Sequence, residues 1–287
     1  SIKGVNIVPE GEVLGQLKMN AGQLFTPKGM GDDLKAMRDF YGSRGYVDMS
    51  AVPEVLPAGP GAVDLTYSID EGVQSYINLV NIQGNTRTRD YVIRREMRLA
   101  EGDAYSADKL KRSRDRLNYL GYFEKADVEQ KPTTDPDKID LDVKVKEQST
   151  GEFNVGAGYS TFDGLLATAD VSERNFLGKG QQVNVRFAVS QRQQQFNVGF
   201  TEPYFMGQDF SAGVDLFNEE TDYQDESSYD RGNMGGALRF GFPLSEYTRN
   251  NVSFGYRNTK ISDVGSGASK FVKREEGDKD SVFLSDT

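Results

Sequence analysis

The clearest pattern in the chain is an alternation of apolar and polar side chains that begins near residue 151. If that first segment is extended, Phe153, Val155, Ala157 and Tyr159 fall on one face, and the polar or small residues between them fall on the other. The same alternation recurs in later segments centred on Val185, Val198, Val214, Phe240 and Phe254. A strand that crosses a membrane needs roughly 9–11 tilted residues, and the alternating segments are of about that length.

This alternation predicts an antiparallel transmembrane β-barrel. Its polar faces are unsuited to a dry core, whereas a barrel presents one face to lipid and the other to water or polar packing, and closure leaves no unpaired edge. A soluble antiparallel sandwich with one solvated face is the alternative that the pattern leaves open.

The first half of the chain contains an internal repeat with a period of about 76 residues. Three pairs of segments carry it: Ile2-Lys-Gly-Val-Asn-Ile7 with Ile77-Asn-Leu-Val-Asn-Ile82, Gly45-Tyr-Val47 with Gly121-Tyr-Phe123, and Val63-Asp-Leu65 with Ile139-Asp-Leu141. Two copies of one small domain are the simplest explanation.

Each copy is predicted to run strand, helix, helix, strand, strand. The predicted helices carry apolar stripes, Leu34, Met37 and Tyr41 in the first copy, and Ile93, Met97 and Ala100 followed by Leu110, Leu117 and Leu120 in the second. Thr26 and Ser106 suit N-caps, and Gly45 and Gly121 suit helix ends. In the last strand we expect Ile139, Leu141, Val143 and Val145 to face inward and Asp140, Asp142, Lys144 and Lys146 to face outward.

The middle strand of each copy is predicted to lie at a sheet edge. These strands span residues 48–56 and 125–131, and Pro53 and Pro132 interrupt or close them. Proline cannot donate to a ladder and is confined to edges. Such an edge is either blunted against aggregation or open to an added peptide strand.

The composition excludes several classes of function. The chain has no Cys and no His, which excludes disulfides, thiol nucleophiles, metal sites built on these residues and any triad containing His. No run of about 18 apolar residues is present, so we expect no transmembrane helix. The net charge of −10 argues against a general nucleic-acid binder. Since no signal peptide opens the chain at Ser1, we expect a processed or shortened chain.

The second copy is rich in Lys and Arg, but acidic residues are interspersed and no aromatic residues are interleaved. These basic residues include Arg94, Arg95, Arg98, Lys109, Lys111, Arg112, Arg114 and Arg116. A solvated helix surface, or a surface for an acidic partner, fits them better than nucleic acid does.

The chain also resembles a known family. The repeats resemble POTRA domains, and residues from Lys144 onward resemble the junction into the barrel of the BamA superfamily. The motifs that carry the resemblance are Arg94-Arg-Glu-Met97, Glu101-Gly102, Arg116-Leu-Asn-Tyr-Leu-Gly-Tyr-Phe123, Val145-Lys-Glu147, residues 151–159, Asn175-Phe-Leu-Gly178, Glu202-Pro-Tyr-Phe205 and Gly241-Phe-Pro-Leu244. They cover nearly the whole chain in the order expected for the family.

The resemblance implies α+β POTRA repeats followed by about eight of the roughly sixteen strands of an outer-membrane barrel. It implies a POTRA domain at residues 1–73, a membrane-proximal POTRA domain at 74–149 and the N-terminal part of the barrel at 150–287. The chain is therefore expected to be a fragment or an incomplete barrel, without the family's luminal Val-Arg-Gly-Phe/Tyr motif.

The resemblance further implies a protein that folds and inserts other outer-membrane barrels, with its POTRA domains in the periplasm and its barrel in the outer membrane. The implied partners are outer-membrane lipoproteins, unfolded client proteins, periplasmic chaperones and the bilayer, with no nucleic acid and no cofactor. The Glu101-Gly102 turn matches the place where the family docks a partner lipoprotein.

Loop lengths give an orientation. If the repeats are periplasmic, the loops after odd-numbered barrel strands face outward. Two long predicted loops, residues 218–231 and 259–280, follow odd strands, whereas the turns at 176–180, 203–209 and 244–250 are shorter.

An inserter that lacks a nucleotide site must use binding energy. No GxxxxGK[ST] motif is present, and residues 178–180 are better explained as a turn. Gly156 and Gly158 weaken the first barrel strand, so its pairing with a closing strand is expected to be marginal. We hypothesise that this strand is the templating edge for client strands: Phe153, Asn154, Val155, Gly156, Ala157, Gly158 and Tyr159. Alternatively, the glycines serve only close packing inside the barrel.

Other functions are left open or disfavoured. A secretion channel or passive pore would use the same combination of repeats and barrel. An enzyme is not expected, because Ser160, Ser172 and Ser190 have no histidine to activate them.

Overall fold

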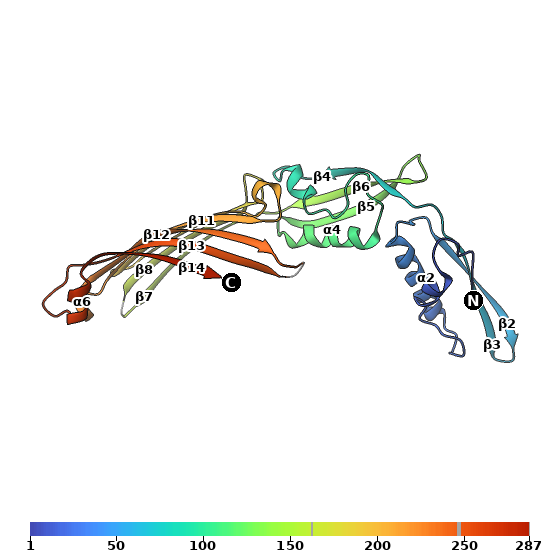
Figure 1. Cartoon of the computed structure of the whole chain (residues 1–287), viewed down its shortest axis with the longest axis horizontal. Helices are drawn as coiled ribbons and strands as arrows, with labels where there is room; N and C mark the ends of the chain where they lie inside the picture. The colour runs from blue at the N-terminus through green and yellow to red at the C-terminus, as the bar shows by residue number, and fades with distance from the viewer. Residues whose placement is uncertain (162, 246–247, 287) are drawn as a thin grey trace. The chain divides into compact units, whose positions relative to one another are not determined.

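The computed structural model describes residues 1–161, 163–245 and 248–286, and the chain divides into two compact units, Ser1–Gln148 and Ser149–Thr287. Figure 1 shows helices packed against short sheets in the first unit and long strands lying side by side in the second. Among the described residues, no helix has the length and apolar character needed to cross a membrane.

The first repeat has the predicted order of elements. It consists of β1 (Ile2–Lys3), α1 (Glu10–Leu14), α2 (Pro27–Gly42), β2 (Ser50–Gly59) and β3 (Ala62–Asp70). The sheet order is β1-β3-β2, with β1 parallel and β2 antiparallel to β3. The predicted cap is confirmed, since the Thr26 hydroxyl accepts a hydrogen bond from the backbone N–H of Gly29 at 3.0 Å. Met37 and Tyr41 of α2 are fully buried against the sheet.

The second repeat has the same order. It consists of β4 (Tyr76–Gln83), α3 (Asp90–Arg94), α4 (Ala107–Tyr119), β5 (Phe123–Pro132) and β6 (Lys138–Glu147), with sheet order β4-β6-β5. Ser106 caps α4, as predicted, by accepting from the N–H of Lys109. β2 and β5, the predicted edge strands, do lie at the edges of their sheets.

One inward/outward prediction in β6 is wrong. Its four apolar residues are buried as expected, but Asp142 is buried too, at 1% exposure. β6 is the central strand, so side chains from both neighbouring strands cover its outer face. Lys131 of β5 forms an ion pair with Asp142, and the Asn81 amide of β4 donates to it at 3.3 Å. A buried carboxylate requires such partners.

The two repeats share a carboxylate that fastens the loop after the first strand. Glu147 at the end of β6 accepts hydrogen bonds from the backbone N–H groups of Thr86, Arg87 and Thr88, the last at 2.6 Å. Burial opposes the ionisation of Glu147, but the hydrogen bonds from Thr88 and Thr86 outweigh it and lower its pKa to about 2. The Glu of the Val-Lys-Glu motif therefore has a structural role.

The matching residue of the first repeat is Glu71. Its carboxylate accepts from the backbone N–H groups of Asn6 at 2.8 Å and Ile7 at 2.9 Å, and from the Tyr41 hydroxyl at 2.8 Å. The glycines that precede these loops also match. A Cβ on Gly4 or Gly84 would lie about 2 Å from a carbonyl oxygen of the last strand, and both glycines have positive φ. The repeat thus recurs in its hydrogen bonds as well as in its fold.

The second unit is one antiparallel sheet in which each strand pairs with the next along the chain. Its strands are β7 (Gly151–Ser160), β8 (Gly164–Phe176), β9 (Gln181–Val189), β10 (Gln193–Glu202), β11 (Ser211–Asp222), β12 (Asp230–Pro243), β13 (Arg249–Ser262) and β14 (Gly277–Asp286). Short helices occur in three connections: η1 (Phe205–Gly207), α5 (Gln224–Ser227) and α6 (Lys270–Glu275).

The register keeps apolar residues in rows across the strands. One row joins Val183, Phe200, Val214, Leu238, Phe254 and Leu284, each paired with its neighbour. On the other face, the Arg239 guanidinium donates to Asp215 at 2.9 Å and to the Thr201 hydroxyl at 3.0 Å. The sheet therefore has one apolar and one polar face, as predicted.

The predicted loop lengths need correction. β11 continues to Asp222 and β12 begins at Asp230, so most of the predicted loop 218–231 is strand. The remaining connection, 223–229, is no longer than the one at 203–210. The other predicted outer loop shortens to 263–276 and contains α6. Polar side chains at strand ends continue the ladder, because backbone pairing does not require apolar residues. Within the predicted turn 244–250, residues 246–247 lie outside the described residues.

Candidate functional site

The strand proposed as a template, β7, forms one edge of the eight-stranded sheet, and β14 forms the other. β7 pairs with β8 along its whole length, from Gly151 opposite Glu173 to Ser160 opposite Gly164. Within the described residues, no strand pairs with its other side. A strand directs half of its backbone N–H and C=O groups to each side, so this edge can accept a further strand.

The side chains of β7 follow the predicted alternation. Phe153, Val155 and Tyr159 are 69%, 70% and 78% exposed, respectively. Together with Ala157 they lie opposite apolar residues of β8, namely Val171, Ala169, Ala167 and Leu165. Asn154, Gly156 and Gly158 lie on the other face, where Asn154 is opposite Asp170. All seven predicted residues therefore lie on one exposed strand with one apolar side.

The two glycines of β7 differ in their surroundings. A Cβ on Gly156 would lie 2.7 Å from the Thr168 hydroxyl oxygen, whereas a Cβ on Gly158 would meet no described atom within 4 Å. Close packing within this unit therefore gives a reason for glycine at position 156 and none at position 158. At Gly158, the remaining effect is the greater conformational entropy that glycine loses in a strand.

The start of β7 is fixed by contacts that the sequence analysis did not identify. The Thr150 hydroxyl bonds to the Glu173 carboxylate, which also accepts from the N–H of Asn175 at 2.8 Å. The N–H of Arg174 donates to the Thr150 carbonyl at 3.3 Å, and its guanidinium pairs with Glu152 at 3.3 Å. β7 is thus anchored at its start, so any change in pairing is easiest further along the strand.

The predicted partner-contact turn lies in the second repeat. The Glu101 carboxylate accepts from Arg94 at 2.8 Å and from the N–H of Val80 at 3.2 Å. Hydrogen bonds from its own backbone N–H and from Arg94 lower the pKa of Glu101, against the effect of burial. Gly102 has a φ of +91° and no atom within 4 Å of an added Cβ. The turn is therefore held in shape from one side and open on the other.

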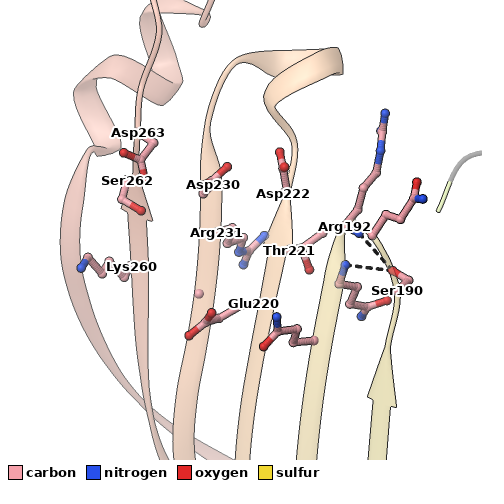
Figure 2. Close-up of a pocket in the computed structure, with 14 residues that line it drawn as sticks. Ser190, Arg192, Glu220, Thr221, Asp222, Asp230, Arg231, Lys260, Ser262 and Asp263 are labelled. Atoms are coloured by element: carbon pink, nitrogen blue, oxygen red, sulfur yellow. Dashed lines mark hydrogen bonds between the residues drawn. The ribbon is translucent and has the colours of Figure 1, made fainter. Parts of the chain in front are cut away.

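A hollow of about 360 Å³ lies at the end of the sheet opposite the start of β7 (Figure 2). Its lining mixes charges of both signs, including Arg192, Glu220, Asp230 and Lys260. The Ser190 hydroxyl, at its edge, accepts hydrogen bonds from the backbone N–H groups of Arg192 and Gln193, at 3.2 and 2.9 Å (dashed in Figure 2). Ser190 therefore serves the turn between β9 and β10.

Two β-α-α-β-β repeats joined to an amphipathic antiparallel sheet define an outer-membrane protein with periplasmic repeats. A family model described as POTRA, "Surface antigen variable number repeat", matches residues 1–72 and 75–148, and one described as "Omp85 superfamily domain" matches 175–286. The chain belongs to the Omp85 superfamily and, within it, to the BamA family.

Relatives and solved structures agree with this assignment. The chain is 36% identical to the outer membrane protein assembly factor BamA of Nitratidesulfovibrio vulgaris over 259 residues, covering 89% of this chain and 32% of the relative. The figures for BamA of Neisseria meningitidis are 34% over 262 residues, 89% and 33%. The chain spans about a third of these relatives' length.

The structure of BamA from Haemophilus ducreyi lacking POTRA domains 1–3 matches with a TM-score of 0.79 and 25% identity, covering 100% of this chain and 56% of that one. CdiB from Escherichia coli, at 14% identity and a TM-score of 0.51, covers 91% of this chain and 50% of its own and is similar in fold alone.

Family membership confirms the predicted fold class and location. The repeats are POTRA domains of the periplasm, and the eight-stranded sheet belongs to the barrel of the outer membrane. The start of β7, which follows the repeats directly in the chain, marks the periplasmic end of the sheet. The turns β8–β9, β10–β11 and β12–β13 lie at that same end, because each strand is antiparallel to the next.

Proposed function

We propose that the protein assembles other outer-membrane β-barrels, with the exposed edge of β7 as the template on which client strands pair. The relatives named above are assembly factors, which supports the general role. The single observation that carries the mechanism is the edge itself, which is exposed along its length, apolar on its lipid side and free of a second strand in the described residues.

The energy for this step comes from pairing. An unpaired backbone group in lipid costs several kcal/mol, so an opened β7 edge is unstable until another strand covers it. A client strand that pairs there satisfies these groups and follows the same alternation of apolar and polar residues. Gly158 lowers the stability of the competing closed state, because it adds flexibility without a packing contact.

The domain boundaries and partners belong to the same proposal. We assign one POTRA domain to residues 1–73, the membrane-proximal one to 74–149 and the barrel portion to 150–287. The open side of the Glu101-Gly102 turn would contact an outer-membrane lipoprotein, and the POTRA domains would receive unfolded clients from periplasmic chaperones. In the turn, Arg94 and the N–H of Val80 hold the Glu101 carboxylate, so a partner would meet a preformed surface.

A disulfide lock tests the template. Cysteines in β7 and in the strand that closes the barrel of the full-length protein, oxidised after reconstitution in liposomes, should stop client assembly, and reduction should restore it. The matched control is Val155→Cys with Ala169→Cys, a directly opposed pair of β7 and β8 whose pairing the mechanism never opens. Full assembly with the closing seam locked contradicts the proposal. Ion conductance without client insertion would favour a secretion channel or pore instead.

A further inference from the structure

Two turns at the periplasmic end of the sheet share a sequence pattern and a backbone shape. The β8–β9 turn contains Phe176-Leu-Gly178, and the η1 turn between β10 and β11 contains Phe205-Met-Gly207. In the first, the N–H groups of Gly178 and Lys179 donate to the carbonyls of Asn175 and Phe176, at 2.9 and 3.1 Å. In the second, the N–H groups of Gly207 and Gln208 donate to the carbonyls of Tyr204 and Phe205, at 3.0 and 3.2 Å.

The middle residue of each pattern has a left-handed backbone. Leu177 has a φ of +55° and Met206 a φ of +56°, and the glycines that follow have φ values of +71° and +76°. Two successive positive φ values are typical of a type I′ turn, whose first central position favours Asn, Asp or Gly. A bulky side chain in this conformation costs about 1–3 kcal/mol.

The protein does not offset this cost by packing. Leu177 is 65% exposed and Met206 is 84% exposed. The third turn at this end also presents an exposed aliphatic side chain, since Leu244, directly after β12, is 66% exposed. A large apolar residue therefore projects from the sheet at every second strand, at one level, around the periplasmic rim.

These turns continue the lipid-facing surface of the sheet. Phe240 of β12 has the same orientation as Leu238, on the apolar face. Its ring stacks on Phe210 with centroids 5.9 Å apart, and Phe210 packs edge-on against Phe205, next to Met206, at 6.3 Å. A chain of aromatic rings thus links the apolar face to the turn. Outer-membrane barrels carry such aromatic girdles at the level of the membrane interface.

We propose that Leu177 and Met206 insert into the periplasmic leaflet of the outer membrane, at the boundary of headgroups and acyl chains, with Leu244 as a third contact. The occupant is lipid, because the residues recur around the rim and adjoin the lipid-facing aromatic surface. Burial in lipid supplies the apolar contact that the protein withholds and offsets the strained turn. This inference depends on the membrane location of the family and not on client pairing, so either proposal can fail alone.

The test uses the full-length protein reconstituted without partners. The described chain has no native cysteine, so Leu177→Cys and Met206→Cys can each carry an NBD fluorophore. Vesicles of phosphatidylcholine with bromine on the upper acyl chain should strongly quench both labels, relative to unbrominated vesicles. The control is Lys179→Cys, an exposed polar position of the same turn, whose label should be quenched far less and should respond more to aqueous iodide.

A second measurement avoids substitutions. In the same vesicles, a water-soluble oxidant such as chloramine T should convert native Met206 to its sulfoxide as slowly as Met234, a residue of β12 on the apolar face that is 61% exposed in the free chain. Rapid oxidation of Met206 alone, together with unquenched labels, overturns the proposal. Protection that arises only after lipoprotein partners are added overturns it as well, because the occupant is then a protein.

Discussion

Replacing Glu147 by Gln tests whether the hydrogen bonds of one carboxylate hold the membrane-proximal repeat together. In the wild-type protein this carboxylate accepts hydrogen bonds from the N–H groups of Thr86, Arg87 and Thr88 and from the Thr86 hydroxyl at 2.7 Å. Gln presents an NH₂ group in place of one oxygen, so it cannot accept all of these bonds, and it has no charge to strengthen the rest.

The magnitude follows from the lowered pKa. Glu147 falls from an ordinary 4.5 to about 2. At about 1.4 kcal/mol per pH unit, this corresponds to about 3 kcal/mol, which partial solvent exposure reduces to about 2 kcal/mol. Because the pKa is lower in the folded state, the stabilisation is fully present above pH 4.5 and is lost as the pH falls toward 2. Glu147→Gln should therefore be less stable by about 2 kcal/mol at pH 7, with a difference that shrinks in acid.

The assay is urea unfolding of residues 1–148, a compact unit with two cores of its own, followed by circular dichroism between pH 7 and pH 2.5. The control is Glu124→Gln, which removes an exposed ion pair with Lys146 and should change the free energy of unfolding by less than about 1 kcal/mol. Equal stability of Glu147→Gln and wild type at pH 7, or a difference that does not change with pH, would refute the reasoning.

Three further outcomes follow from single positions. Thr26→Ala and Ser106→Ala should each cost about 1 kcal/mol in the same urea assay, because each removes an N-cap; no loss in either would contradict the capping geometry. Gly84→Ala should cost more than about 2 kcal/mol, because its Cβ would overlap a carbonyl oxygen, whereas Gly22→Ala, with positive φ but open space, should cost about 1 kcal/mol; equal costs would mean that strain alone matters. Gly158→Val should leave the barrel folded, as judged by gel mobility with and without heating, but slow client assembly in liposomes; an unchanged rate would remove Gly158 from the mechanism.

Much of the fold is predictable from the sequence because a membrane strand must alternate. Lipid on one side and polar groups on the other fix the residue type at each position, so β7 to β12 stand out as a pattern. The strand ends do not, because above the membrane the ladder continues with polar residues such as Glu220 opposite Gly232. Predicted loops were too long for this reason. Burial of Asp142 was missed because it depends on side chains from two neighbouring strands.

The candidate site was predictable to a lesser degree. The exposed alternating strand is evident in residues 153–159, whereas the anchor between Thr150 and Glu173 depends on strand register. The roles of Glu71 and Glu147 were hidden because the loops they fasten lie more than 55 residues away. The repeated Phe-Leu-Gly and Phe-Met-Gly turns were visible in the sequence, but only their shared positive φ values set them apart from ordinary turns.

The central claim is that client strands pair with the free edge of β7, and stepwise cross-linking tests it most directly. Single cysteines at positions 153–159 of the full-length protein would be combined with single cysteines along the terminal strand of a client arrested during assembly. The account predicts disulfides that advance along the client one residue for each residue moved along β7, with none from cysteines in β11, which is paired on both sides. Cross-links that ignore this register, or that form equally well from β11, would contradict it.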